Sequence, residues 1–216
     1  MLILDRRALV GAALSAAVLP RAVLAAPPAN TTLHFNVLRN GKPFGAYQLA
    51  FVTNGDTLTA TTDVAMAAKI AGLTVFNYRH HCEEVWKGGR FMELHSNSVR
   101  DNDKDFCTAV RTSTNIAITN KDGPLFAPLA ASPYTHWNPA TIQGPLFNPE
   151  TGFMLRLAAQ PMGHEPFALA NGSKVTANHW AMRGESEIDE WYDDAGVWAG
   201  LRAVFPDKSI VEYRRT

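Results

Sequence analysis

The fold is decided by residues 57–70, which read TLTATTDVAMAAKI. Alternate positions, from Leu58 through Met66 to Ile70, are suited to a core, and most of the positions between them are small or polar. A repeat of two residues is typical of a β-strand that turns one face toward a core. We therefore expect a half-buried strand over residues 58–70.

The same alternation continues along most of the chain. Residues 73–86 place Phe76, Tyr78 and Trp86 on one face. Asn-Gly, Gly-Gly and Asp-Gly pairs between the segments predict tight turns. Further strands are predicted at 33–39, 44–53, 90–100, 106–119, 174–182, 187–192, 197–205 and 209–214. Many short strands predict an all-β protein, built as a strongly curved antiparallel sheet or as an open or closed barrel.

One proline-rich stretch, residues 123–152, interrupts the strand pattern. Proline cannot donate a hydrogen bond to a neighbouring strand, so this stretch does not read as a central strand. Its aromatic residues, among them Tyr134, Trp137 and Phe147, argue against a disordered linker. We expect an irregular loop that covers the curved sheet, either as a plug at one end or as a lid over a site.

Residues 1–25 have the organisation of a secretory signal peptide. Arg6-Arg7 precede an apolar run from Ala8 to Leu19, and small residues lead to an expected cleavage point after Ala25. The run is too short to cross a bilayer of about 30 Å, which disfavours a membrane anchor. The arginine pair favours twin-arginine export, with the ordinary secretory route as the alternative. We expect a periplasmic protein whose mature part, residues 26–216, is a single β-domain without a transmembrane segment.

The charge balance argues against a nucleic-acid partner. The whole chain has 20 basic and 20 acidic residues, and loss of the signal leaves 17 basic and 19 acidic ones. A slightly acidic domain has no electrostatic attraction for nucleic acid or for an anionic membrane. The length is sufficient for one domain with a real core.

Cys82 and Cys107 are the two cysteines of the chain. An exported protein can form disulfides. If the chain turns at Gly88-Gly89 and again near Asn102, the cysteines lie two strands and several residues apart, or about 15 Å. A disulfide needs Cα atoms within about 7 Å, so a bridge would require barrel curvature or a different strand register.

The run His80-His81-Cys82-Glu83-Glu84 suggests a possible metal or catalytic cluster. On a strand, His81 and Glu83 share one face, and pairing of Trp86 with Arg90 would place them opposite His95 and Glu93. Two histidines and two glutamates on one patch would suit a transition metal, whereas a register slip of one residue would destroy the arrangement. The alternative interpretation is the polar outer face of a strand.

The chain shows no nucleophile elbow, phosphate-binding loop or dinucleotide fingerprint. An acidic run around Trp191-Tyr192 contains Glu187, Asp189, Glu190, Asp193 and Asp194. Paired carboxylates can act as acid and base in glycoside cleavage, but such a run is also typical of a solvated strand end.

Two groups of short motifs carry a resemblance to a known family. One is the segment from Tyr78 to Val110, which contains Glu84-Val85-Trp86-Lys87-Gly88-Gly89-Arg90-Phe91, and the other comprises Gly184, Trp191-Tyr192-Asp193, Gly196-Val197-Trp198 and Ile210-Val211-Glu212-Tyr213. Together they resemble exported bacterial β-proteins classed only as a domain of unknown function. That group is broadly similar to curved-sheet periplasmic carriers of lipoproteins and lipids. The resemblance implies a curved sheet and assigns no catalytic residues.

The function expected first is binding or carriage of an apolar or amphipathic, lipid-like ligand, without catalysis and without a cofactor. The concave face of the sheet would hold the ligand, and the loop that carries Trp137 would cover the mouth. The expected ligand-binding residues are Met66, Ile70, Phe76, Tyr78, Trp86, Met92, Leu94 and Trp137. The same residues could instead form a filled core, because small barrels are often packed solid.

Two other functions remain open from the sequence. One is a metal-assisted or acid/base hydrolase of the cell envelope, which would use His81, Glu83, Glu93 and His95, or the acidic run. The other is an interaction module of an envelope complex, marked by exposed Trp191 or Trp198.

Overall fold

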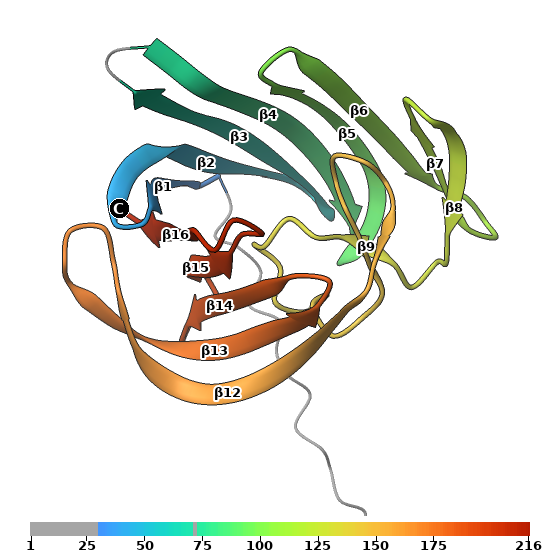
Figure 1. Cartoon of the computed structure of the whole chain (residues 1–216). Coiled ribbons are helices and arrows are strands. Elements are labelled where there is room, and N and C mark those ends of the chain that lie inside the picture. The colour runs from blue at the N-terminus through green and yellow to red at the C-terminus, as the bar shows by residue number, and fades with distance from the viewer. Residues whose placement is uncertain (1–29, 71–72) are drawn as a thin grey trace, which may run out of the picture.

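The computed structural model describes residues 30–70 and 73–216, so the expected signal peptide lies outside the described residues (Figure 1). The described residues form an all-β protein, as expected. The strands are β1 (Thr32–Arg39), β2 (Lys42–Asn54), β3 (Thr57–Ile70), β4 (Leu73–Lys87), β5 (Arg90–Arg100), β6 (Asp103–Arg111), β7 (Ile116–Asn120), β8 (Gly123–Ala127), β9 (Ser132–Pro133), β10 (Leu146–Phe147), β11 (Met154–Leu155), β12 (Leu157–Ala168), β13 (Lys174–Gly184), β14 (Glu187–Asp193), β15 (Trp198–Val204) and β16 (Ile210–Arg215).

Thirteen of these strands form one antiparallel sheet. Its order is β12-β13-β14-β15-β16-β1-β2-β3-β4-β5-β6-β7-β8. Two meanders, β1–β8 and β12–β16, are therefore joined where the first strand pairs with the last. The sheet is strongly curved, and we call the space on its concave side, which side chains largely occupy, the hollow; β8 and β12 are the two edges of the sheet (Figure 1).

Burial along β3 confirms the alternation that predicted it. Ala60, Thr62, Val64 and Met66 are buried, whereas the residues between them are more exposed. On β4 the residues Tyr78, His80, Cys82, Glu84 and Trp86 follow the same rule and turn inward. A period of two thus places the predicted set of side chains on the concave face of the sheet.

The structure corrects three strand predictions. The single strand expected at 106–119 is a hairpin, β6–β7, that turns at residues 112–115, where Thr112 Oγ1 accepts hydrogen bonds from the backbone N–H groups of Thr114 and Asn115. The irregular loop begins at residue 128 rather than 123, because Gly123–Ala127 forms β8. β12 was not predicted. Both missed strands contain prolines, and both lie at a sheet edge, where a missing N–H is tolerated.

Residues 128–156, which we call the plug, connect the two edges of the sheet. The chain leaves β8 at one edge and must reach β12 at the other, and it does so across the hollow (Figure 1). Short strands β9, β10 and β11 form a small sheet within this segment. Ala131, Tyr134, Ile142, Leu146 and Phe147 are buried in the same core as the inward side chains of the large sheet. Of the two roles expected for the loop, a plug is the one that this packing supports.

The described residues include no helix long and apolar enough to cross a bilayer.

Candidate ligand-binding site

Two fully buried glutamates hold the plug against opposite walls of the hollow. The first is Glu190 on β14, which accepts hydrogen bonds from the Tyr134 hydroxyl at 2.7 Å and from Trp198 Nε1 at 2.8 Å. His136 Nδ1 lies 2.6 Å from the same carboxylate. The Tyr192 hydroxyl adds a bond to the carbonyl oxygen of His136. Buried carboxylates need such partners, because desolvation of an unpaired charge is costly.

The second glutamate, Glu84 on β4, binds the other side of the plug. Trp137 Nε1 of the plug donates to one carboxylate oxygen at 3.2 Å, and Trp86 Nε1 donates to the other at 2.9 Å. Burial raises the pKa of Glu84 to about 7, against the lowering effect of hydrogen bonds from Thr135, Trp86 and Trp137. The segment 134–137 is therefore fixed between β4 and β14 by alternate residues.

These contacts correct two predictions about the C-terminal strands. The acidic run is not a uniformly solvated strand end, because Glu190 is fully buried under the plug. Trp191 and Trp198, expected as exposed markers of an interaction module, are 8% and 1% exposed. Trp198 lies in the core, where its ring packs on Phe35 and His136. No local pattern indicated these burials, because Trp198 and Glu190 contact the distant plug, and Trp191 packs on Phe167 of β12, a strand that was not predicted.

The plug leaves one part of the concave face uncovered. There a pocket of about 550 Å³ lies between β2–β4 and the end of β14–β16. We call it the concave pocket. Its apolar lining includes Phe44, Met66, Phe76, Ile188, Ala203 and Phe205. The rings of Phe44 and Phe76 are stacked at 5.5 Å and form one apolar wall.

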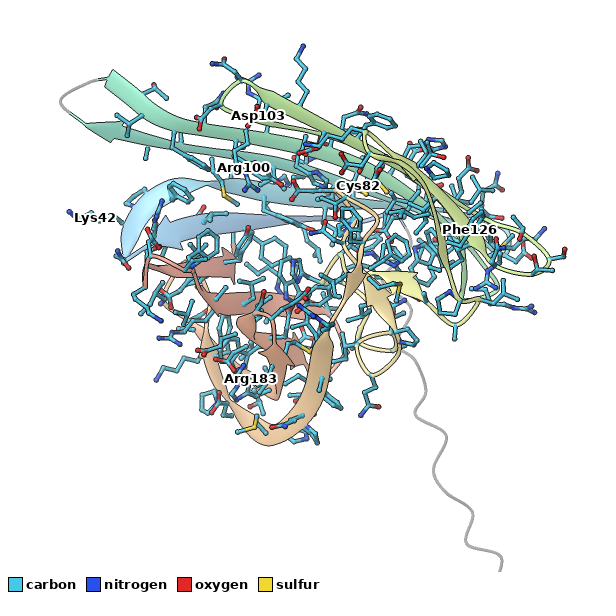
Figure 2. The ribbon with its side chains drawn as sticks, turned by 45° about the vertical axis from the view of Figure 1, so that its right-hand side comes forward. Lys42, Cys82, Arg100, Asp103, Phe126 and Arg183 are labelled. Carbon is cyan, nitrogen blue, oxygen red and sulfur yellow. The ribbon has the colours of Figure 1, made fainter. Side chains whose placement is uncertain are left out.

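The rim of the concave pocket carries charges of both signs. Arg39 forms an ion pair with Asp207 and lies 5.4 Å from the Phe44 ring. Arg100, labelled in Figure 2, lies over the ring of Tyr78 and 4.0 Å from Glu150. Hydrogen bonds from Ser209 and the pairing with Arg39 lower the pKa of Asp207. The two arginines thus face two carboxylates, and the rim has no net charge to select an ionic ligand.

The predicted ligand-binding residues divide between the concave pocket and the packed interior. Met66, Phe76 and Tyr78 line the pocket. The other predicted residues with described side chains do not: Trp86, Leu94 and Trp137 are buried in the core, and Met92 lies at a bulge of β5. The Ile70 side chain lies outside the described residues. Near Trp86 and Leu94, the plug occupies the space in which we expected a ligand. The plug residues that pack there are distant from Trp86 and Leu94 in sequence.

A smaller cavity of about 110 Å³ lies behind the concave pocket, between the plug and the sheet. We call it the inner chamber. Tyr78, Glu150 and Tyr213 line both cavities and form the boundary between them. Most of its other lining residues carry polar groups: Thr62 and His80 come from the sheet, and the plug contributes residues 134–136. Burial lowers the pKa of His80. The sequence analysis did not single out this chamber, because half of its wall comes from the plug.

A third pocket lies on the outer face of β1–β5. Its volume is about 700 Å³, and its exposed side chains include His34, Asp63, Arg79 and His81. It shares none of the apolar wall of the concave pocket. We therefore take the concave pocket as the better candidate for an apolar ligand.

The register assumed for the metal alternative is wrong. Arg90 pairs with Lys87 rather than with Trp86, and a bulge that leaves Met92 without a partner on β4 shifts the pairing once more, so that Glu83 lies opposite His95 and His81 lies opposite Asn97. Glu93 pairs with Val85 instead. The four expected ligands remain on the outer face, but they do not converge.

Each histidine of that set already has a carboxylate partner. His81 Nδ1 lies 2.7 Å from Asp63, and His95 Nε2 lies 2.6 Å from Glu93. Within residues 30–70 and 73–216, no group of three or more His, Cys, Asp or Glu side chains could hold a metal ion. The polar outer face of a strand describes these residues better than a metal centre does.

The two cysteines are separate thiols. Cys82 and Cys107 both pair with Ser96, from the two sides of β5, so they lie in one row rather than several residues apart. Two strand spacings are about 10 Å, still beyond the reach of a disulfide. Burial raises the pKa of Cys107 to about 11 and that of Cys82 well above its usual value.

Comparison with family models matches residues 35–216 to one described as a domain of unknown function, DUF6134. The chain belongs to the DUF6134 family. This DUF6134 chain is also similar to the crystal structure of a beta-barrel-like protein of domain of unknown function DUF1849 from Brucella abortus, with a TM-score of 0.58 and 7% identity. The similarity covers 87% of this chain and 97% of the other, and at this identity it concerns the fold alone. Comparison with curated proteins finds no match.

Proposed function

We propose that this protein is a periplasmic binding or carrier protein for an apolar, lipid-like ligand, which occupies the concave pocket. The observation that carries the proposal is the pocket itself. Its volume of about 550 Å³ lies within the range of small-molecule sites, and most of its wall is apolar. Phe44 and Met66 are 6% and 7% exposed, and together with the partly buried Phe76 they form the boundary between the core and the pocket.

The surroundings of the concave pocket also suit an apolar ligand. Glu84 and Glu190 fix the plug to both walls beside the pocket, and the plug contributes Glu150 to the pocket lining. Burial of apolar ligand surface contributes roughly 25 cal/mol per Å², so a ligand that covers the Phe44–Phe76 wall gains affinity without specific polar contacts. The signal-like residues 1–25 support placement of this binding function in the periplasm.

The experiment uses N-phenyl-1-naphthylamine, an uncharged probe whose fluorescence rises in apolar surroundings. The purified protein should bind it with saturable affinity. Ala203→Trp places a large side chain in the pocket, and we expect it to weaken binding at least tenfold. Ala67→Trp is the matched control, because Ala67 is exposed on the opposite face of β3. Equal binding by both variants would place the probe elsewhere and contradict the proposal.

A second measurement concerns the natural ligand. Protein purified from the periplasm without denaturation should release a lipid into organic solvent, which mass spectrometry detects. The Ala203→Trp variant should release much less of the same species than Ala67→Trp. No lipid from the unmodified protein, together with no probe binding, would count decisively against a carrier function.

A further inference from the structure

His80 has a buried nitrogen atom that the protein does not satisfy. Its side chain is on the inward face of β4, it is 7% exposed, and it lines the inner chamber. His80 Nδ1 is the one buried side-chain nitrogen or oxygen without a hydrogen-bond partner among the described residues. A buried polar atom without a partner costs about 1–3 kcal/mol, so such an atom calls for a partner from outside the chain.

The neighbours of His80 do have partners. The Tyr47 hydroxyl shares a hydrogen bond of 3.3 Å with Thr62 and contacts the carbonyl oxygen of Thr135. The Tyr78 hydroxyl donates to Glu150 at 2.7 Å. His80 Nδ1 is thus the unpaired buried nitrogen at the chamber, beside hydroxyl groups of Tyr47, Thr62 and Tyr78 that are already engaged. Its volume of about 110 Å³ is enough for a small head group.

From this geometry we infer that the inner chamber binds the head group of the ligand, and that this head group is an uncharged hydroxyl. The inference rests on the proposed function, because the chain of the same ligand would occupy the concave pocket. Tyr78, Glu150 and Tyr213 border both cavities, so the polar end of the ligand lies beyond this boundary and its apolar part lies in front of it.

The charges around the chamber favour an uncharged group. An anionic head group finds no free cationic partner among the described residues of the chamber, because Arg100 lies near Glu150 and the His136 ring engages Glu190. A cationic head group lacks a free counter-charge, because Glu150 is engaged by Tyr78 and lies near Arg100, and Glu190 is engaged by three plug and sheet donors. Transfer of an unpaired charge into such a site is costly.

The chemistry of Nδ1 favours a hydroxyl over a carbonyl. A neutral imidazole nitrogen donates in one tautomer and accepts in the other. A carbonyl oxygen can only accept, whereas a hydroxyl can do both and therefore pairs with Nδ1 in either tautomer. The ligand class is thus a hydroxyl-bearing lipid, such as a long-chain alcohol or a monoacylglycerol.

The test compares decane derivatives that differ only at the head group, measured by displacement of N-phenyl-1-naphthylamine. The protein should bind 1-decanol about tenfold more tightly than 1-chlorodecane, which corresponds to one hydrogen bond to a buried group. Decylamine and decanoate should bind more weakly than 1-decanol. His80→Leu should remove the preference for the alcohol and leave the affinity for 1-chlorodecane within about twofold.

The matched control is His81→Leu, because His81 lies one residue further on β4 and is exposed on the outer face. It should keep the full preference. A second variant, His80→Asn, applies if the leucine variant does not fold: its shorter side chain retreats from the chamber and should reduce the preference at least threefold.

Each other result overturns the inference in a recognisable way. Equal affinity for 1-decanol and 1-chlorodecane in the unmodified protein would refute the head-group site and leave the carrier proposal standing. Tighter binding of decylamine or decanoate would refute an uncharged head group. A preference that survives His80→Leu would exclude His80. Failure of every probe to bind would refute the proposed function, and the inference with it.

Discussion

The concave face of one curved sheet has a closed half and an open half. In the closed half Phe91, Leu94 and Trp86 pack against Phe147 and Trp137 of the plug. In the open half Phe44 and Phe76 face a pocket. The strands alternate in the same way in both halves. The comparison shows that the path of the plug determines which part of the hollow is filled. The sequence of the sheet determines only which side chains face the hollow.

The largest expected effect is loss of an aromatic side chain in the closed half. Trp137→Ala removes a buried ring that packs on Phe51 and Trp86 and donates to Glu84. We expect the free energy of unfolding to fall by about 3–5 kcal/mol. Urea unfolding followed by tryptophan fluorescence and circular dichroism measures it. A loss below about 1 kcal/mol would mean that the plug does not form part of the core.

The second effect tests the plug through pH. Because burial raises the pKa of Glu84 to about 7, the folded protein holds a proton there that the unfolded chain releases near pH 4.5. Stability from this group is therefore full below about pH 4.5 and is lost as the pH rises to about 7, on the order of 3 kcal/mol in total.

The measurement compares urea unfolding at pH 5 and pH 8 for the unmodified protein and for Glu84→Gln. The glutamine variant should lose the part of the pH dependence that Glu84 contributes. Identical pH profiles for the two proteins would show that Glu84 keeps an ordinary pKa despite its burial.

The third effect concerns the place where the plug touches the sheet. Gly152 has φ of +73°, and a Cβ built there would lie 2.4 Å from Ile118 Cγ2. We expect Gly152→Ala to cost about 2–4 kcal/mol, from backbone strain and steric overlap. Gly172→Ala is the control, because Gly172 has φ of +84° with no atom near its Cβ position, and it should cost about 1 kcal/mol. Equal melting temperatures for the two variants would contradict close packing of the plug.

The smallest effect on stability belongs to the open half. Phe76 is only partly buried, and its ring stacks on Phe44 at the pocket wall. Phe76→Ala should reduce the free energy of unfolding by about 1–1.5 kcal/mol, well below the loss for Trp137→Ala, because truncation enlarges an existing pocket rather than a packed core. The same variant should weaken binding of N-phenyl-1-naphthylamine severalfold. A stability loss as large as that of Trp137→Ala would remove the distinction between the halves.

The sequence predicted the large sheet well, because strand periodicity is a local property. The strand at 58–70 and its inward face are confirmed, and so is the all-β class. Edge strands β8 and β12 were missed because their prolines resemble loop signals. The register assumed for the metal hypothesis is wrong at two places, the turn, where Lys87 pairs with Arg90, and the bulge beside Met92, and no local pattern indicated either.

The candidate site was predictable only in part. Met66, Phe76 and Tyr78 were found because alternation alone places them on the concave face. The buried roles of Glu84 and Glu190 were not, because their partners at residues 134–137 lie about fifty residues away in sequence on either side. Contacts between the plug and the two walls join residues that are distant in sequence, so they produce no periodic pattern from which they could be predicted.

The pairing of β1 with β16 in the middle of the sheet also has a consequence for biosynthesis. Phe35 lies opposite Arg215, and Val37 lies opposite Tyr213, so the seam joins residues separated by almost the whole described chain. A nascent chain can form the β1–β8 meander early, but one edge of β1 remains unpaired until β16 has been synthesised. Such non-local closure predicts slow folding and exposes the waiting strand to chaperones or to aggregation. The last strand is therefore needed both for packing of the domain and for the completion of its folding after synthesis.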